Sequence, residues 1–257
     1  MKYFVLTFLL FIAFFSVSFS IDPIRCQGVA NGHLQGFDSD GKYIYWSTKS
    51  SLIKTDHTGK VIAQVPVTPH HGDCCIHKGR LYVATIEKRG NFITVYDCRD
   101  LSHITDYPID FGYDNLEGID IDGITFFKGH FYVGEGKDPK SEQEFNWIHK
   151  YTPGFKHVKK IKIPGKTKYG IQTITYVDGF FWLGTYSNEK TYQCDKNFNI
   201  IGYHTVNISV GAYGLPRSKN GEIRLMVARN IKLGNDKWSA DCVPAVLRNG
   251  KLEWEEK

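Results

Sequence analysis

The sequence lacks a sustained helical pattern, a second long hydrophobic run and a paired-cysteine metal motif. No window repeats its apolar residues with the 3.6-residue period of an amphipathic helix, which excludes a helical bundle. No segment beyond residue 20 is long and apolar enough to cross a membrane as a helix. No two of the six cysteines are separated by two residues, as in structural zinc sites. The net charge of +5 comes largely from one local basic run, so it says little about partners.

Residues 1–20, MKYFVLTFLLFIAFFSVSFS, have the pattern of a cleaved signal peptide. Lys2 precedes an apolar core, and SFS at 18–20 offers the small-x-small pattern of a cleavage site. A membrane anchor is the alternative, but the apolar run between Lys2 and the serines at 16–20 is shorter than the roughly twenty residues that a span needs. We therefore expect a secreted, extracellular protein with one domain over residues 21–257. Its cysteines could form disulfides in that compartment, and the NIS sequon at Asn207 could carry a glycan.

One phrase occurs five times and predicts the fold. A polar residue and a glycine are followed by an alternating aromatic or aliphatic run, which is typical of a tight hairpin turn feeding a half-buried strand. The turn glycines are separated by 38, 50, 50 and 42 residues, which suits four-stranded blades. The copies are DGKYIYWSTK (40–49), KGRLYVATIE (78–87), KGHFYVGEGK (128–137), DGFFWLGTYS (178–187) and NGEIRLMVAR (220–229).

A small-residue segment precedes each turn and a second hairpin follows each repeat. Glycine and other small residues are expected where inner strands crowd around a central axis. We therefore predict an all-β, five-bladed β-propeller of four-stranded antiparallel blades around a central channel. The segment Ile21–Gly32 is expected to pair with the last blade and close the ring, so that Cys26 could form a disulfide with Cys242.

Functional side chains are expected at one end of the channel, which we call the mouth. In propellers, the loops that lead into the inner strands and those that leave the second strands share this end. Different polar groups that converge on one concave surface predict a ligand site, whereas the alternative is a mouth that is polar only because it is built from loops. The candidate substrate-binding residues are His33, Gln35, His70, Gln172, Tyr213, Tyr186 and Arg229.

The HHGD segment at residues 70–73 suggests chemistry. His71 and Asp73 are two residues apart, so we expect their side chains on one face of a strand. That geometry suits a general base oriented by a carboxylate, or two metal ligands. The alternative is a structural hydrogen bond that ties neighbouring blades.

The acidic segment DNLEGIDID at residues 114–122 is the second candidate for chemistry. Glu117 could act as a catalytic acid or base together with His71 and Asp73. Glu117, Asp120 and Asp122 could instead hold one divalent cation, calcium or zinc, although their spacing matches no loop-type calcium motif.

Cys74 and Cys75 are adjacent, so on a strand they point to opposite faces and cannot easily bind one metal. We expect both to be small buried core residues, with a disulfide to one of them as the alternative.

The basic run at residues 154–170 contains six lysines and one histidine. We expect it on the outermost strand of blade 3, where lysines protect an exposed sheet edge. The alternative is an attraction to a sulfated glycan or an anionic membrane surface.

The LQGF at 34–37, the LEGI at 116–119 and the blade repeats resemble the secreted glutaminyl-peptide cyclotransferases of plant and bacterial type, a family of five-bladed propellers. The likeness spans nearly all of the mature chain and lies mainly in the blade pattern. It implies a mouth glutamate in proton transfer and places Gln35 and Glu117 in the site. The sequence has no Glu-Gly-Trp-Gly segment of that family, and its HHGD is foreign to the pattern. A looser similarity to gluconolactonase-type propellers implies a central divalent metal, for which Glu117 could serve.

The starts of the five inner strands carry different residues, which favours one asymmetric site over the repeated sites of a lectin. We predict a secreted enzyme, a hydrolase, lyase or cyclotransferase, that acts on an extracellular small molecule, sugar or peptide terminus by acid–base chemistry, with or without a metal. A non-catalytic propeller that binds one ligand or a protein is the alternative. We expect a monomer that binds a small-molecule, glycan or peptide ligand, without nucleic-acid binding or stable membrane insertion.

Overall fold

The computed structural model describes residues 22–68, 70–88, 90–112, 120–186 and 190–255, and in these ranges it contains strands and no helix. Accordingly, none of these ranges contains a helix with the length and apolar character of a membrane span. The signal peptide predicted for residues 1–20 lies outside the described residues.

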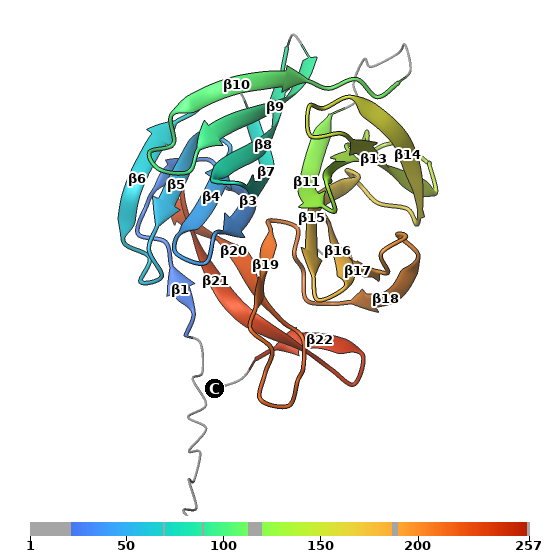
Figure 1. The fold of residues 1–257 in the computed structure, drawn as a ribbon. Coiled ribbons are helices and arrows are strands. Elements are labelled where there is room, and N and C mark those ends of the chain that lie inside the picture. Colours follow the sequence, from blue (N-terminus) through green and yellow to red (C-terminus); the bar gives the residue numbers. More distant parts are fainter. Residues whose placement is uncertain (1–21, 69, 89, 113–119, 187–189, 256–257) are drawn as a thin grey trace, which may run out of the picture.

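Five antiparallel sheets are arranged as the blades of a propeller around a central axis (Figure 1). The innermost strands β3, β7, β11, β15 and β19 contact one another in a closed ring, and the other strands follow outward in chain order. The predicted five-bladed propeller is therefore confirmed. Blade 1 contains β3 (Leu34–Ser39), β4 (Ile44–Thr48), β5 (Ser51–Thr55) and β6 (Val61–Pro66); blade 2 contains β7 (His70–His77), β8 (Arg80–Glu87), β9 (Gly90–Asp97) and β10 (His103–Pro108); blade 3 contains β11 (Ile121–Phe127), β12 (His130–Glu135), β13 (Phe145–Tyr151) and β14 (His157–Pro164); blade 4 contains β15 (Ile171–Val177), β16 (Phe180–Thr185), β17 (Thr191–Cys194) and β18 (Ile200–His204).

Blade 5 is assembled from both ends of the chain. Its strands β19 (Ala212–Leu215), β20 (Arg224–Gly234) and β21 (Lys237–Arg248) come from the C-terminal part. Three short strands then share the outer edge of β21: β22 (Lys251–Trp254), β1 (Ile24–Arg25) and β2 (Ala30–Asn31). The predicted pairing of the N-terminal segment with the last blade is confirmed, and it leaves the ring closed.

The turns between the first two strands of blades 2, 3 and 4 show why the repeated phrase begins as it does. Lys78 and Gly79 have φ angles of 50° and 71°, and Asp178 and Gly179 have 52° and 94°. Two successive residues with positive φ form the tight turn that matches the twist of a hairpin. Glycine at the second position relieves the strain of that conformation.

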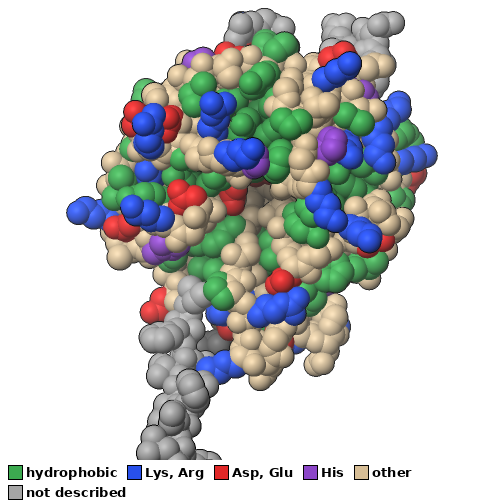
Figure 2. All heavy atoms as spheres, viewed as in Figure 1, with side chains coloured by type: hydrophobic (Ala, Val, Ile, Leu, Met, Phe, Trp, Pro, Cys, Tyr) green, Lys and Arg blue, Asp and Glu red, His purple; other side chains and the backbone are tan. Residues whose placement is uncertain are grey.

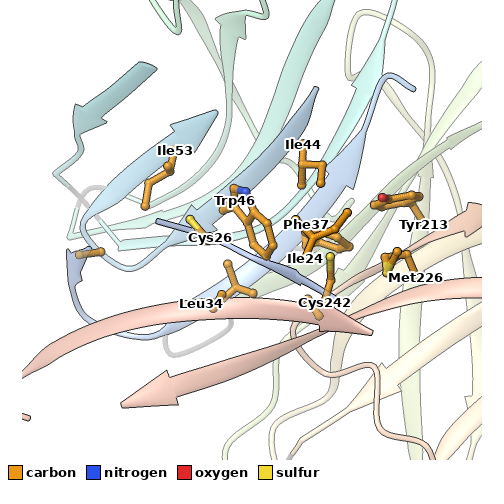
Figure 3. Packing of buried hydrophobic residues seen from close by; sticks show 13 residues of the cluster. Ile24, Cys26, Leu34, Phe37, Ile44, Trp46, Ile53, Tyr213, Met226 and Cys242 are labelled. Carbon is orange, nitrogen blue, oxygen red and sulfur yellow. The ribbon is translucent and has the colours of Figure 1, made fainter. Parts of the chain in front are cut away.

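The cores lie between adjacent blades, where large side chains from neighbouring sheets pack together. Figure 3 shows the cluster between blades 5 and 1, in which Phe37, Trp46 and Tyr213 gather beside Met226. The ring centroids of Phe37 and Trp46 lie 4.8 Å apart. Burying one such side chain contributes roughly 1.5–3 kcal/mol, so these interfaces hold the blades in place.

The predicted disulfide between Cys26 and Cys242 is not formed in the structure, although both residues belong to this cluster (Figure 3). The register explains why. Cys242 pairs with Ile24, and the amide of Cys26 donates to Ala240, so the two cysteines are diagonal and not direct neighbours. Diagonal neighbours are about 7–8 Å apart, at the upper limit of disulfide geometry. Both thiols pack as small apolar side chains.

Cys74 and Cys75 point to opposite faces, as predicted. Cys74 belongs to the cluster between blades 1 and 2, and Cys75 to the cluster between blades 2 and 3. Both thiols are free and buried. Their role is packing at two different blade interfaces.

The predicted glycan on Asn207 conflicts with the local geometry. The side-chain oxygen of Asn207 accepts a 2.7 Å hydrogen bond from the amide of Ser209. Its amide nitrogen, to which a glycan would be attached, is buried with no hydrogen-bond partner in the described structure. This placement argues against a glycan at Asn207.

The basic run behaves as an edge strand. Residues 157–164 of the run form β14, the outermost strand of blade 3, as predicted. Lys160 and Lys162 lie over the rings of Trp147 and Phe145 on the adjacent strand, at 4.6 and 4.0 Å from the ring centroids. These lysines cover apolar surface at a sheet edge that would otherwise be open to pairing.

Candidate functional site at the channel mouth

Four of the five inner strands carry a β-bulge at the same place, just inside the mouth. The register of each strand against its neighbour shifts between Leu34 and Gly36, His71 and Cys74, Ile121 and Ile124, and Ile171 and Thr173. Bulges bend a strand and redirect side chains, and they occur often beside functional sites. The sequence pattern gave no sign of these bulges.

The bulges hold the candidate site residues. Gln35, Asp122 and Gln172 each follow the first paired residue of their strand, where the bulge begins, so they occupy equivalent positions in blades 1, 3 and 4. Blade 2 has Gly72 there, and an added Cβ on Gly72 would lie 3.4 Å from the backbone oxygen of Asp122. That distance is an ordinary van der Waals contact, so packing does not require glycine here. Gly72 offers no polar side chain, and His70 carries the polar side chain of blade 2.

Gln35 and His70 form a hydrogen-bonded pair across blades 1 and 2. The amide nitrogen of Gln35 lies 2.7 Å from Nε2 of His70. Burial, with the nearby charges of Lys49 and His33, lowers the pKa of His70 to about 4. The imidazole is therefore neutral at pH 7, and since Nε2 accepts from the amide, its proton lies on Nδ1.

Asp122 and Gln172 form the corresponding pair across blades 3 and 4. Gln172 donates through its amide nitrogen to Oδ2 of Asp122 at 2.8 Å and contacts the backbone oxygen of Tyr169 at 3.2 Å. Burial and the charge of Asp120 raise the pKa of Asp122 to about 7, although the hydrogen bond from Gln172 opposes this shift. At neutral pH Asp122 can therefore both give and take a proton.

Aromatic rings flank the two pairs. His33 packs edge-on against Trp238, with ring centroids 5.7 Å apart, and Tyr169 packs edge-on against the exposed Tyr186 at 4.5 Å. Arg229, predicted to bind substrate, instead forms a bidentate ion pair with Asp241 on the adjacent strand, at 2.8 and 2.6 Å. His33 and Tyr186 thus remain candidates for ligand contact, whereas Arg229 already has a partner.

The predicted arrangement of His71 and Asp73 on one strand face is wrong. The bulge between His71 and Cys74 breaks the alternation of side chains that the prediction assumed. His71 is fully buried, and its Nε2 lies 3.1 Å from the hydroxyl of Tyr96. No hydrogen bond between His71 and Asp73 is present in the described structure, so Asp73 does not orient a base.

Asp73 closes the channel instead. Its Oδ2 accepts hydrogen bonds from the backbone amides of Ile124 in blade 3 and Ile174 in blade 4, at 3.0 and 3.1 Å. Burial raises the pKa of Asp73 well above its ordinary value. The side chain spans the axis and ties three blades together, which is the structural alternative stated for this segment, although with other partners.

Two of the three predicted metal ligands, Asp120 and Asp122, lie within the described residues. Glu117 lies outside the described residues. Asp120 is exposed, and Asp122 is bound to Gln172. Within the described ranges, no group of three or more His, Cys, Asp or Glu side chains is arranged to hold a metal ion.

A buried network on blade 3 was not singled out from the sequence. Glu135, at the mouth end of β12, accepts a 2.8 Å hydrogen bond from Nε2 of the fully buried His149. Nδ1 of His149 in turn lies 3.2 Å from Nε2 of His157. These residues lie on three adjacent strands, so only the strand register, which the sequence does not specify, brings them together.

Tyr213 does not lie at the predicted end of the channel. It pairs with Met226, and the residues equivalent to it in other blades, such as Asp38 and Thr125, lie near the ends of their inner strands. Tyr213 lines a cavity of about 910 Å³ at the opposite end, which we call the hairpin end because the inner strands turn there into the second strands.

The fold and these contacts define a five-bladed β-propeller with an asymmetric mouth. No protein-family model matches the chain, and no curated protein matches it. Among solved structures, the glutaminyl cyclase of Myxococcus xanthus is similar, with a TM-score of 0.61 and 12% sequence identity over 90% of this chain and 97% of that one. Virginiamycin B lyase from Staphylococcus aureus has a TM-score of 0.45 and 13% identity over 91% of this chain and 73% of that one. At such identities the likeness to the Myxococcus protein establishes the fold.

Proposed function

We propose that the protein is an extracellular enzyme with one active site at the mouth, acting on a small molecule, sugar or peptide terminus by acid–base chemistry. The observation that carries this proposal is Asp122, an acid on a bulge whose pKa of about 7 suits proton exchange at neutral pH. Asp73 also has a raised pKa, but its carboxyl is held by the backbone amides of Ile124 and Ile174, whereas the carboxyl of Asp122 is held by the side chain of Gln172 at the mouth.

The neighbouring pair supplies a different function. Because His70 is neutral and accepts from Gln35 through Nε2, its Nδ1–H can donate a hydrogen bond to an oxygen that develops negative charge. Gln172 orients Asp122 and favours its ionised form. Acid, donor and orienting amide come from different blades, which supports one asymmetric site and not five equal ones.

Peptides with an N-terminal glutamine are the first substrates to test, because the similar solved structure is named a glutaminyl cyclase. In their cyclisation the α-amine nitrogen attacks the side-chain amide carbon, a C–N bond forms, and the bond to the side-chain nitrogen breaks as ammonia leaves. Asp122 can take the proton that the α-amine loses and return it to the leaving nitrogen. No oxidant or reductant is needed.

The test compares wild type with Asp122→Asn on glutaminyl peptides, aryl glycosides and lactones, with ammonia and product mass as readouts. We expect kcat to fall by about 10²-fold or more on the substrate that wild type converts, since one acid–base group typically contributes that much. Asp178→Asn is the matched control, because Asp178 lies in a hairpin turn with positive φ that asparagine also adopts. Unchanged turnover in Asp122→Asn would reject Asp122 as the acid. No turnover of any compound by wild type would favour the non-catalytic binding propeller.

A further inference from the structure

The cavity at the hairpin end is separate from the mouth. It has a volume of about 910 Å³, within the range of small-molecule sites. Between it and the mouth the channel narrows to a void of about 10 Å³ beside Asp73, room for about one water molecule. A ligand of the cavity would therefore not pass through the channel to the mouth.

One residue from each blade faces this cavity at an equivalent position. Each pairs with a residue on the second strand of its blade and lies three residues after the bulge position in blades 1 to 4. The five lining residues, with their partners in parentheses, are Asp38 (Tyr45), Cys75 (Tyr82), Thr125 (Tyr132), Thr175 (Trp182) and Tyr213 (Met226). A carboxyl, a thiol, two hydroxyls and a phenol thus form a ring of unlike groups. Such a ring suits one ligand bound in one orientation.

The charge of the lining is opposite to that of the protein. The chain has 32 Lys and Arg residues against 27 Asp and Glu. Figure 2 shows Lys and Arg side chains spread over one face, which is hollowed at the centre of the ring. The described lining of the cavity, in contrast, contains Asp22 and Asp38 and no Lys or Arg. This composition favours a positively charged ligand.

Two backbone hydrogen bonds hold the carboxyl of Asp38 in place beside the cavity. Its Oδ2 accepts a 2.8 Å hydrogen bond from the amide of Ile76 in blade 2, and its Oδ1 accepts one of 2.8 Å from the amide of Ser39. These bonds fix the carboxyl at the boundary of two blades and leave each oxygen a further lone pair. Phe126, Tyr176 and Tyr213 supply aromatic surface around the same cavity.

We propose that the hairpin-end cavity binds a small organic ammonium ion, with its charged group against Asp38 and its apolar body against the aromatic walls. A carboxylate and aromatic faces together are the chemistry that selects ammonium groups. This site is independent of the proposed enzymatic site at the mouth.

Binding depends on pH in a definite direction. Burial raises the pKa of Asp38 to about 7, and Asp40 adds to the shift. Below pH 7 the carboxyl is largely neutral and attracts a cation weakly, whereas above pH 7 it is ionised and binds. The other titratable groups around Asp38 are Asp22, Asp40, Tyr45, His57, Asp73, Cys74, Cys75, Tyr176 and Tyr213.

The probe is benzyltrimethylammonium, whose charge does not change with pH, measured by isothermal titration calorimetry. We expect its affinity to fall about 10-fold or more between about pH 8 and about pH 5.5, as the ionised fraction of a group with a pKa near 7 falls. Benzyl alcohol, which is neutral, should bind weakly and equally at both pH values. Equal affinity of the cation at both pH values would overturn the proposal.

Two variants test the site. Asp38→Asn removes the charge, and Thr175→Lys places a competing ammonium group in the cavity wall, so both should weaken binding of the probe at about pH 8 by about 10-fold or more. Gln172→Leu is the control, because it alters the other end of the same strand β15 and should bind the probe like wild type. Thermal unfolding checks that each variant folds, and Thr175→Lys keeps the test decisive if Asp38→Asn does not.

Unchanged binding in either folded cavity variant would overturn the proposal. The two proposals also fail separately. Loss of turnover in Asp122→Asn, with cation binding intact in the same variant, supports both proposals. Intact turnover in Asp122→Asn, together with lost cation binding in Thr175→Lys, supports only the cavity.

Discussion

At the scale of single residues, burial determines which histidines and carboxyls can act near neutral pH. His71 was predicted to be a general base or a metal ligand because it lies in HHGD, yet it is buried against Tyr96 with its Nδ1 unpartnered among the described residues. Asp122 belongs to an acidic segment that was predicted to bind a metal ion or to hold a protonated acid. In the structure its pKa is about 7, because burial and the charge of Asp120 raise the pKa more than the hydrogen bond from Gln172 lowers it.

His71 should make the protein sensitive to acid. Burial and the charge of His70 lower the pKa of His71 from 6.5 to about 3, so the folded state binds fewer protons than the unfolded state between these values. Its stabilising effect is present above pH 6.5 and is lost as the pH falls toward 3. We expect the melting temperature of His71→Phe to fall less than that of wild type between about pH 7 and pH 4.5.

The control for this comparison is His130→Phe, at the start of β12 in the next blade. It should follow the wild-type pH dependence. If His71→Phe also follows the wild-type curve, the neutral buried form of His71 is excluded.

At the scale of elements, the repeated turn phrase predicted the hairpins and the blade count, whereas the bulges were not predictable. A tight turn needs glycine at a fixed position, and this glycine occurs in all five copies of the repeated phrase. A bulge depends on how an inner strand meets its neighbours in the ring. LQG, IDG and IQT share an aliphatic residue before Gln or Asp, but HHGD does not, and no turn-type residue marks the bulge in all four strands. The candidate residues Gln35, Asp122 and Gln172 were therefore found, but their orientation and partners were not.

The inner strands pack so closely that Gly36 should not tolerate a side chain. A Cβ at Gly36 would lie 2.4 Å from Cα of Asp73 and 2.7 Å from the backbone nitrogen of Cys74. Backbone atoms cannot move aside easily, so blades 1 and 2 must separate. We expect Gly36→Ala to lower the free energy of unfolding by about 2–4 kcal/mol in urea denaturation.

Gly154→Ala is the comparison variant, because an added Cβ there meets no atom within 4 Å. Its free energy of unfolding should stay within about 0.5 kcal/mol of wild type. Equal effects of the two substitutions would show that the inner strands are less tightly packed than described.

At the scale of the whole molecule, the ring is closed by strands from both ends of the chain, and this too was predictable. A propeller must cover the outer edge of its last blade, and the N-terminal segment was free to do so. The disulfide was not predictable, because the diagonal relation of Cys26 to Cys242 depends on a register that no sequence signal fixes. The cavity at the hairpin end was not predictable, because its lining comes from all five inner strands and Asp38, Cys75, Thr125, Thr175 and Tyr213 share no residue type.

Removal of the closing strands should weaken the whole ring. A chain that begins at Gly32 lacks β1 and β2 and exposes the cluster that Ile24, Cys26 and Ala30 help to bury. We expect a lower melting temperature and increased binding of a hydrophobic dye, compared with a chain that begins at Asp22. Identical melting of the two chains would contradict the role assigned to β1 and β2.

The central claim is that the mouth holds an acid that exchanges its proton near neutral pH, and a ¹³C NMR titration of the Asp122 carboxyl carbon tests it most directly. The account predicts a midpoint near pH 7, a lower midpoint in Asp120→Asn, where a repelling charge is removed, and a higher one in Gln172→Leu, where a stabilising hydrogen bond is lost. A wild-type midpoint near the ordinary aspartate value of 3.8 would contradict it.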